Sequence, residues 1–179
     1  RETLLAVLAD VADTALENEF DGVLLVNGHG GNKPAIGAAV NDIGAAHPDV
    51  TVSGVTYFDL AADVASEIRD SDTGGMAHGG EFETSLLLHL APEMVRTDQL
   101  DGTPLDDPAE RGTRDMFDVG PLQTYRPFRQ YSESGAIGAP EQASAEKGRR
   151  LFEAIVAELS ETIRGMHRRR VTGADDQSP

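Results

Sequence analysis

Apolar positions at helical spacing open the chain, and a short apolar run follows them. Every third or fourth residue between positions 2 and 18 is apolar, which predicts an amphipathic helix there. The next run is uninterrupted and four residues long, which is typical of a strand buried in a parallel sheet. The helical positions are Leu4, Leu5, Leu8, Val11 and Ala15, and the strand is Val23-Leu24-Leu25-Val26.

The same alternation continues along the chain. A stretch rich in β-branched residues, 50–57, predicts a second strand. Four further stretches predict helices, namely 33–46, 59–69, 81–90 and 141–168. This order of helices and strands predicts an α/β sandwich with a largely parallel sheet.

One long segment interrupts the pattern. Residues 91–139 contain most of the prolines and many glycines, and a loop of that length in a compact domain is usually a lid, a binding loop or a subunit contact. The length of the chain suits one domain, which we place at residues 1–168. We expect residues 169–179 to form a disordered tail.

The charge of the chain excludes some partners and suggests a habitat. Thirty-one acidic and 15 basic residues give a net charge of −16, so nucleic acid is not an expected partner. The acidic residues are dispersed and there are two lysines, which favours a halophilic source over an ordinary acidic protein. We find neither a membrane-spanning apolar run nor a signal peptide, and therefore expect a cytoplasmic protein without membrane contact.

The first predicted strand leads into a glycine loop around one histidine, His29. Residues beyond the carboxyl end of a parallel strand commonly form sites. Glycines on both sides of His29 leave room for a ligand, although a tight turn or an anion cradle at the next helix would also explain them. Asn32 is positioned to cap that helix. The residues that we expect to shape this loop are Gly28, Gly30, Gly31 and Asn32.

A second cluster, HGGEFETS, occupies residues 78–85 at a predicted loop-to-helix junction. His78 and Glu81 are three positions apart and can face the same way on a helix. Glu83 points elsewhere and is expected to orient a neighbour or bond a nearby loop. Glutamates in a first helical turn can simply favour the helix dipole, but a second glycine-flanked histidine beside them favours a site.

The available ligand types point to a metal rather than a covalent nucleophile. The chain contains no cysteine, so thiolate catalysis and cysteine-bound zinc are excluded. Histidine together with carboxylate suits Zn, Mn or Fe. These residues do not by themselves complete a hydrolytic metal site.

The two clusters together resemble the creatininase family, the creatinine amidohydrolase-like metal hydrolases. The resemblance is carried by EFDGVLLVNGHGGN at residues 19–32, HGGEFETS at 78–85 and GAIGAPEQASAEKG at 135–148, and it covers most of residues 1–165. It implies a three-layer α/β/α sandwich, a dinuclear Zn, Mn or Fe site and a homo-oligomer, commonly a hexamer.

The resemblance also implies roles for individual residues. His29 would be a metal ligand and Glu81 the carboxylate ligand of the second metal, in place of the glutamate that creatininase carries where this chain has Gly31. His78 would assist proton transfer near the scissile bond, and Glu83 would support the site. The family takes a glutamate, a histidine and a bridging aspartate from an earlier segment that this sequence lacks, so we interpret the chain as a fragment.

The expected function is metal-dependent hydrolysis of a C–N amide bond in a small substrate, a cyclic amide or a formamide. A peptidase acting in cofactor maturation is an alternative, as is a non-catalytic binding or oligomer-forming relative with an incomplete metal site. A nucleotide-phosphate binder that uses residues 28–33 is a weaker alternative. The absence of tryptophan argues mildly against creatinine itself as the substrate.

Overall fold

A computed structural model describes residues 1–105 and 111–175, with side chains to residue 168. Its internal contacts group the chain into two compact units. Unit 1 comprises Arg1–Leu60 and the C-terminal residues from Ala157, and unit 2 comprises Ala61–Val156. The prediction of one domain over residues 1–168 stays a prediction.

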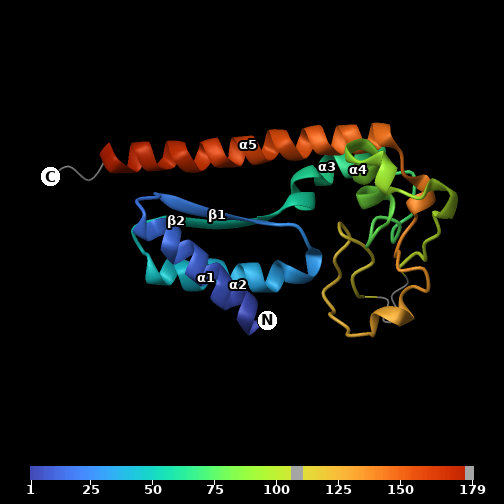
Figure 1. Cartoon of the computed structure of the whole chain (residues 1–179), viewed down its shortest axis with the longest axis horizontal. Helices are drawn as coiled ribbons and strands as arrows, with labels where there is room; N and C mark the ends of the chain where they lie inside the picture. The colour runs from blue at the N-terminus through green and yellow to red at the C-terminus, as the bar shows by residue number, and fades with distance from the viewer. Residues whose placement is uncertain (106–110, 176–179) are drawn as a thin grey trace. The chain divides into compact units, whose positions relative to one another are not determined.

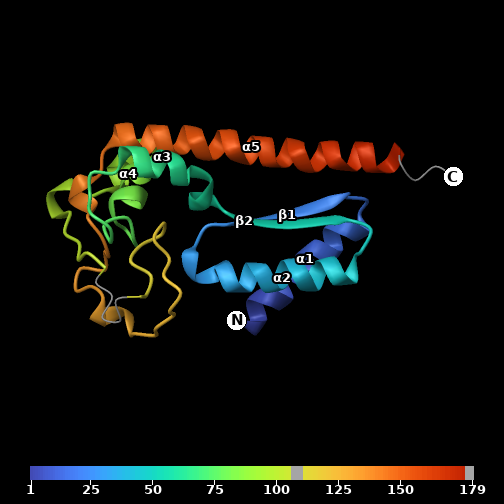
Figure 2. The same ribbon diagram turned by 180° about the vertical axis from the view of Figure 1, so that it is seen from behind.

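Unit 1 is built on two parallel strands. Helix α1 (Glu2–Glu17) leads into β1 (Gly22–Asn27), and α2 (Lys33–Ala46) connects it to β2 (Thr51–Thr56). The strands pair in parallel from Gly22 opposite Thr51 to Asn27 opposite Thr56. In Figures 1 and 2, α1 and α2 cover one face of the strands, and the part of α5 from Ala157 runs along the other face.

The core of unit 1 lies between the strands and the two helices α1 and α2. Ala12, Ala39 and Ile43 are almost fully buried there, and leucines and valines of α1 and both strands pack around them. Gly54 lets α2 approach β2 closely, because a Cβ at this position would lie 2.7 Å from Ile36 Cγ2. This packing fixes the carboxyl ends of both strands, where Asn27 and Thr56 lie side by side.

Unit 2 holds three helical segments and a long irregular region. It contains α3 (Ala62–Ile68), α4 (Glu81–Leu90) and the first part of α5 (Ala145–Asp175). Short 3₁₀ turns punctuate the irregular region at Pro92–Met94, Thr97–Gln99, Phe128–Gln130 and Pro140–Gln142. The expectation of a long loop over residues 91–139 therefore fits the described part of that segment.

The other predicted elements differ from the structure mainly at their ends. The helix predicted over 59–69 begins as a 3₁₀ turn, Tyr57–Ala61, before α3. The last helix begins at Ala145 instead of residue 141, after the 3₁₀ turn that starts at Pro140. It also continues to Asp175, so the tail expected from residue 169 begins as helix, and residues 176–179 lie outside the described residues.

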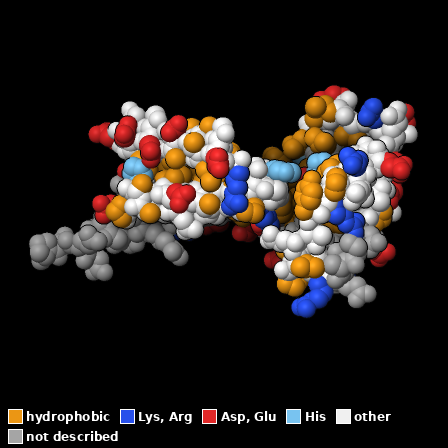
Figure 3. All heavy atoms as spheres, turned by 90° about the horizontal axis from the view of Figure 1, so that it is seen from below, with side chains coloured by type: hydrophobic (Ala, Val, Ile, Leu, Met, Phe, Trp, Pro, Cys, Tyr) orange, Lys and Arg blue, Asp and Glu red, His pale blue; other side chains and the backbone are white. Residues whose placement is uncertain are grey.

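The acidic side chains are as dispersed on the surface as they are along the sequence. On the face shown in Figure 3, acidic side chains are scattered instead of gathered in one patch. Among the described residues, no helix combines the length and the apolar character needed to cross a membrane.

Candidate functional site

His29 lies immediately after β1, where the chain leaves the sheet. Its backbone is extended, with φ −145° and ψ 125°, and it precedes the 3₁₀ turn η1 (Gly30–Asn32) that opens α2. The residue is exposed. Among the described residues, no group hydrogen-bonds a ring nitrogen of His29, so the imidazole can accept a ligand.

The backbone of His29 is held on both sides by one side chain, that of Asn27. The Asn27 Oδ1 atom accepts the His29 N–H at 3.2 Å, and Nδ2 donates to the His29 carbonyl at 2.8 Å. Nδ2 also donates to Thr56 Oγ1 at 3.0 Å, which ties the loop to the end of β2. Asn27 is 3% exposed, and a buried amide with its donors and acceptor satisfied is a rigid support.

Sequence reasoning missed the role of Asn27. The signal was present, because a polar residue at the end of an otherwise apolar strand must find hydrogen-bond partners once it is buried. Its partners are the backbone of His29, two residues later, and a side chain 29 residues away.

The glycines of the loop differ in what they provide. A Cβ at Gly31 would lie 2.7 Å from His29 Nε2, so a side chain there would require the exposed imidazole ring to move. A Cβ at Gly30 would make an ordinary contact with Phe58, and one at Gly28 would meet nothing within 4 Å. Among these three glycines, only Gly31 has a close neighbour, and that neighbour is the His29 ring.

The predicted cap at Asn32 is not formed by its side chain. The structure gives that side chain no capping hydrogen bond, and the Asn32 backbone N–H instead donates to the His29 carbonyl at 3.0 Å. At the next position, the Lys33 ammonium pairs with Asp59 at 2.8 Å and lies 4.5 Å from the centroid of the Phe58 ring. With its lysine neutralised, this loop gives little support to the phosphate-cradle alternative.

In unit 2, His78 is exposed in the loop before α4. Its ring meets Phe128 edge to face, with centroids 5.4 Å apart and an interplanar angle of 89°. Its carbonyl accepts the Ile137 N–H at 2.6 Å, which ties this loop to the segment before α5. The imidazole is thus accessible while its backbone is fixed.

Glu83 supports the turn beside His78. Its Oε2 atom accepts the N–H of Gly79 at 2.6 Å, and Thr84 Oγ1 donates to the carbonyl of Gly79 at 3.0 Å. Gly79 has φ +63°, a left-handed conformation that glycine adopts without penalty. Both backbone polar groups of Gly79 are therefore held by side chains of α4, and the supporting role expected for Glu83 stays a prediction.

Glu81 is fully buried, and its carboxylate already has partners. Oε1 accepts the Asp70 N–H at 3.0 Å and an ion pair from Lys147, and Oε2 accepts the Ser71 N–H at 3.0 Å. Burial alone would raise the pKa of Glu81, but Lys147 and these backbone amides outweigh it and hold that pKa below its usual range. Glu81 is therefore a charged group whose charge is compensated inside the protein.

His29 has the chemistry of a single metal ligand, whereas Glu81 is already engaged by other groups. The exposed imidazole of His29 has the donor chemistry and the fixed backbone that a ligand needs. The Glu81 carboxylate is enclosed, with an ammonium group beside it. In the described part of the chain, no three His, Cys, Asp or Glu side chains are grouped so that they could hold a metal ion.

The predicted site residues are divided between the two units. His78, Glu81 and Glu83 share one junction in unit 2. His29 and its glycine loop belong to unit 1, together with the supporting Asn27. Each group is well defined within its own unit.

Comparisons with known proteins agree with these motifs. The sequence model described as "Creatininase: Creatinine amidohydrolase" matches residues 1–163. The chain is 33% identical over 136 residues to the mycofactocin precursor peptide peptidase of Mycobacterium ulcerans, covering 76% of this chain and 45% of that protein. It is 29% identical over 171 residues to the creatinine amidohydrolase of Pseudomonas putida, covering 90% and 62%.

A solved structure shows the same fold. The crystal structure of a candidate creatinine amidohydrolase from Bacteroides fragilis matches with a TM-score of 0.76 at 23% identity, covering 92% of this chain and 61% of that one. This likeness confirms the predicted α/β fold. The chain spans about half the length of the peptidases that it matches and about three fifths of the amidohydrolase.

Proposed function

The chain belongs to the creatininase family, and from that membership we propose that it acts as a metal-dependent amidohydrolase. Members of this family are hydrolases of C–N bonds and are generally metal-dependent. The observation that carries the proposal for this chain is His29, which has an exposed imidazole and a backbone held by Asn27 at the carboxyl end of a parallel strand.

In this proposal His29 is a metal ligand, with Zn, Mn or Fe as the candidate ions. A bound ion of this kind acidifies water and polarises a carbonyl group. Asn27 keeps the His29 backbone fixed, and Gly31 leaves space for the ring. The ring therefore presents its nitrogens without reorganisation of the loop, which favours binding.

His78 moves the proton in the proposed reaction. Water adds to the amide carbonyl carbon and gives a proton to the His78 imidazole, the C–N bond breaks, and the imidazole passes that proton to the leaving nitrogen. His78 is exposed and can reach a substrate, and Phe128 supports its ring. Glu83 acts on the same loop by holding the N–H of Gly79.

The substrate is a small amide or a short peptide. Similarity to the mycofactocin precursor peptide peptidases favours the peptide, because two of them match at 33% and 31% identity over more than three quarters of this chain. Similarity to the Pseudomonas putida creatinine amidohydrolase supports the cyclic amide. A homo-oligomer, such as a hexamer, and a halophilic, cytoplasmic setting remain part of this proposal.

A hydrolysis assay tests the proposal. The purified chain is loaded with Zn²⁺, Mn²⁺ or Fe²⁺ and incubated separately with creatinine and with mycofactocin precursor peptide, and the products are followed by mass spectrometry. We expect cleavage of one substrate, loss of cleavage when EDTA removes the metal, and recovery when the metal is restored. A high-salt buffer is included, because a net charge of −16 is screened there.

The outcome separates the proposed enzyme from the binding protein. Cleavage that persists unchanged in EDTA would contradict metal dependence. If folded protein binds a substrate but cleaves neither substrate with any of the three metals, the result would favour a non-catalytic relative.

A further inference from the structure

We propose that Glu81 and Lys147 form a buried ionic anchor that fastens the loop before α4 to α4 and α5, and that Glu81 is not a metal ligand. This loop comprises Arg69–Gly75, and we call it the anchored loop. The inference rests on the proposed function in one respect: it removes Glu81 from the candidate ligands of the proposed metal ion. His29 keeps its proposed role.

The first argument is that the Glu81 carboxylate is buried and already accepts three donors. Each of its oxygens accepts a backbone N–H of the anchored loop, from Asp70 and from Ser71, both at 3.0 Å. Lys147 adds a charge-assisted bond to Oε1. Three of the roughly four acceptor sites of this carboxylate are therefore in use, and at 0% exposure the group is closed to an ion from solvent.

The second argument is that Lys147 is equally committed. Its three ammonium protons have three acceptors: Glu81, the Asp70 carboxylate at 2.6 Å and the Gln142 carbonyl at 2.7 Å. Burial would lower the pKa of Lys147, but Asp70 and Glu81 outweigh it and hold that pKa above its usual range. A positive charge therefore stays beside Glu81 and repels a second cation.

The third argument is that Glu81 ties the anchored loop through its backbone as well. Its N–H donates to the Gly75 carbonyl at 3.0 Å, and the same carbonyl accepts the Ala139 N–H at 2.9 Å. A side chain at Gly80 or Gly138 would clash with that carbonyl, which explains both glycines. Glu81, the first residue of α4, thus holds the anchored loop near both of its ends. The last residue of this loop, Gly75, is three positions before His78.

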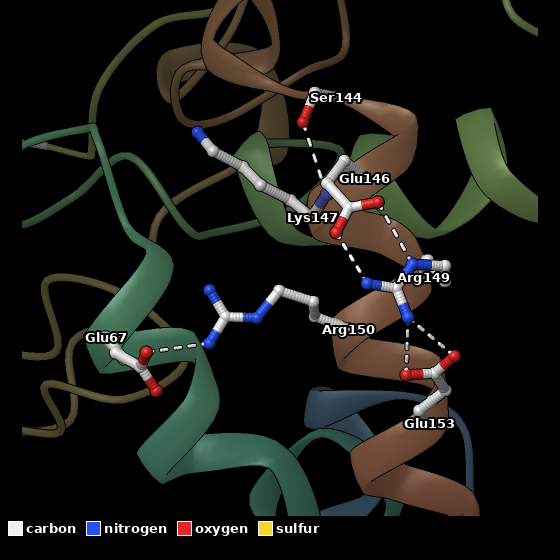
Figure 4. Close-up of polar contacts among 7 residues, drawn as sticks. All are labelled: Glu67, Ser144, Glu146, Lys147, Arg149, Arg150 and Glu153. Carbon is white, nitrogen blue, oxygen red and sulfur yellow. Dashed lines mark hydrogen bonds and ion pairs between the residues drawn. The ribbon is translucent and has the colours of Figure 1, made fainter.

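Lys147 differs from its neighbours on α5. Arg149 and Arg150 form exposed pairs, with Glu146 and Glu153 and with Glu67 respectively. Figure 4 shows the Lys147 side chain leaving α5 in a different direction from Arg149. The Lys147 side chain is 13% exposed, whereas that of Arg150 is 38% exposed. Exposed ion pairs such as those of Arg149 and Arg150 contribute little to the free energy of unfolding. Breaking a buried ion pair such as that of Lys147 lowers this free energy much more.

Unfolding by urea in the presence of EDTA tests the anchor without any metal. The variants are Glu81→Gln, Lys147→Met and the double variant, followed by far-UV circular dichroism, with Glu67→Gln as the matched exposed control. We expect Glu81→Gln and Lys147→Met each to lower the urea midpoint by about 1–2 M. The double variant should unfold near the midpoint of Glu81→Gln alone, because the two residues act as one unit, and Glu67→Gln should change little.

Metal binding by the same variants supplies the second readout. Under the proposal, folded Glu81→Gln binds as much Zn²⁺ or Mn²⁺ as the unaltered chain in equilibrium dialysis. An unchanged urea midpoint of Glu81→Gln in EDTA, or a loss of metal in Glu81→Gln with full retention in Lys147→Met, would overturn the anchor. If the unaltered chain binds no metal, the proposed function fails in this chain, and the urea experiment still decides on the anchor.

Discussion

Replacing His78 by alanine is expected to lower the turnover of the amide substrate by about 10²–10⁴-fold. In the proposed reaction the leaving nitrogen departs as a neutral amine only if it gains a proton, and His78 is the group proposed to deliver it. The fold should be retained, since the His78 ring is exposed and its recorded ring contact is the edge-to-face one with Phe128. The measurement is kcat at saturating metal, with thermal unfolding recorded in parallel.

The matched control is His167→Ala. His167 is an exposed histidine on α5 with no role in the proposed reaction, so its removal should leave kcat and unfolding unchanged. A His78→Ala protein that is folded, loaded with metal and as active as the control would show that another group moves the proton. A loss of activity accompanied by unfolding would instead assign His78 a structural role.

The Asp115→Asn substitution should destabilise the protein by about 3–5 kcal/mol. Asp115 is buried, and its two oxygens accept the Gly74 N–H at 3.0 Å, the Phe117 and Asp118 N–H groups at 2.9 Å each, and an ion pair from Arg69. An asparagine turns one of these oxygens into a donor that faces other donors. It also leaves Arg69 without its counter-charge, and urea unfolding at neutral pH measures the loss.

The same carboxylate predicts how stability changes with pH. Burial alone would raise the pKa of Asp115, but the backbone N–H groups of Gly74 and Phe117, together with Arg69, hold it below the ordinary value of 3.8. The folded state thus favours the charged form, so this contribution is complete at neutral pH. It is lost as the pH falls from about 4 through the lower folded pKa.

Two comparisons check this account of Asp115. In Asp118→Asn, an exposed carboxylate that pairs with Arg114 at 2.5 Å is lost, and we expect a cost of about 0–1 kcal/mol. The stability difference between the unaltered chain and Asp115→Asn should shrink on acidification below pH 4. A difference that stays constant from neutral pH to pH 2, or an Asp115→Asn protein as stable as Asp118→Asn, would contradict the buried network.

Local sequence patterns predicted the regular elements well. The amphipathic run before residue 18 and the apolar run Val23–Val26 correspond to α1 and β1, and residues 81–90 coincide with α4. These elements are set by periodicity and by nearby glycines, which a sequence displays directly. The family motifs were equally local, and the match over residues 1–163 confirmed the recognition.

Contacts between distant residues could not be predicted in the same way. The family resemblance implied a metal-ligand role for Glu81, and nothing in the local sequence indicates that its partner is Lys147, 66 positions later. Arg69 and Asp115 are 46 positions apart. Periodicity shows which face of a helix is apolar, but the partner of a buried charge depends on the tertiary structure. A local prediction also differed at the first turn of α2. The side chain of Asn32 was expected to cap this helix, but the hydrogen bond there is made by its backbone N–H, which donates to the His29 carbonyl.

Metal binding at His29 is the central claim, and equilibrium dialysis of the chain against Zn²⁺ or Mn²⁺ tests it most directly. The unaltered chain and His167→Ala are predicted to bind the ion with equal affinity. His29→Ala should bind it at least about tenfold more weakly, because a ligand on a fixed backbone is lost. Equal binding by His29→Ala and the unaltered chain, or no binding by either, would contradict the claim that His29 holds a catalytic metal.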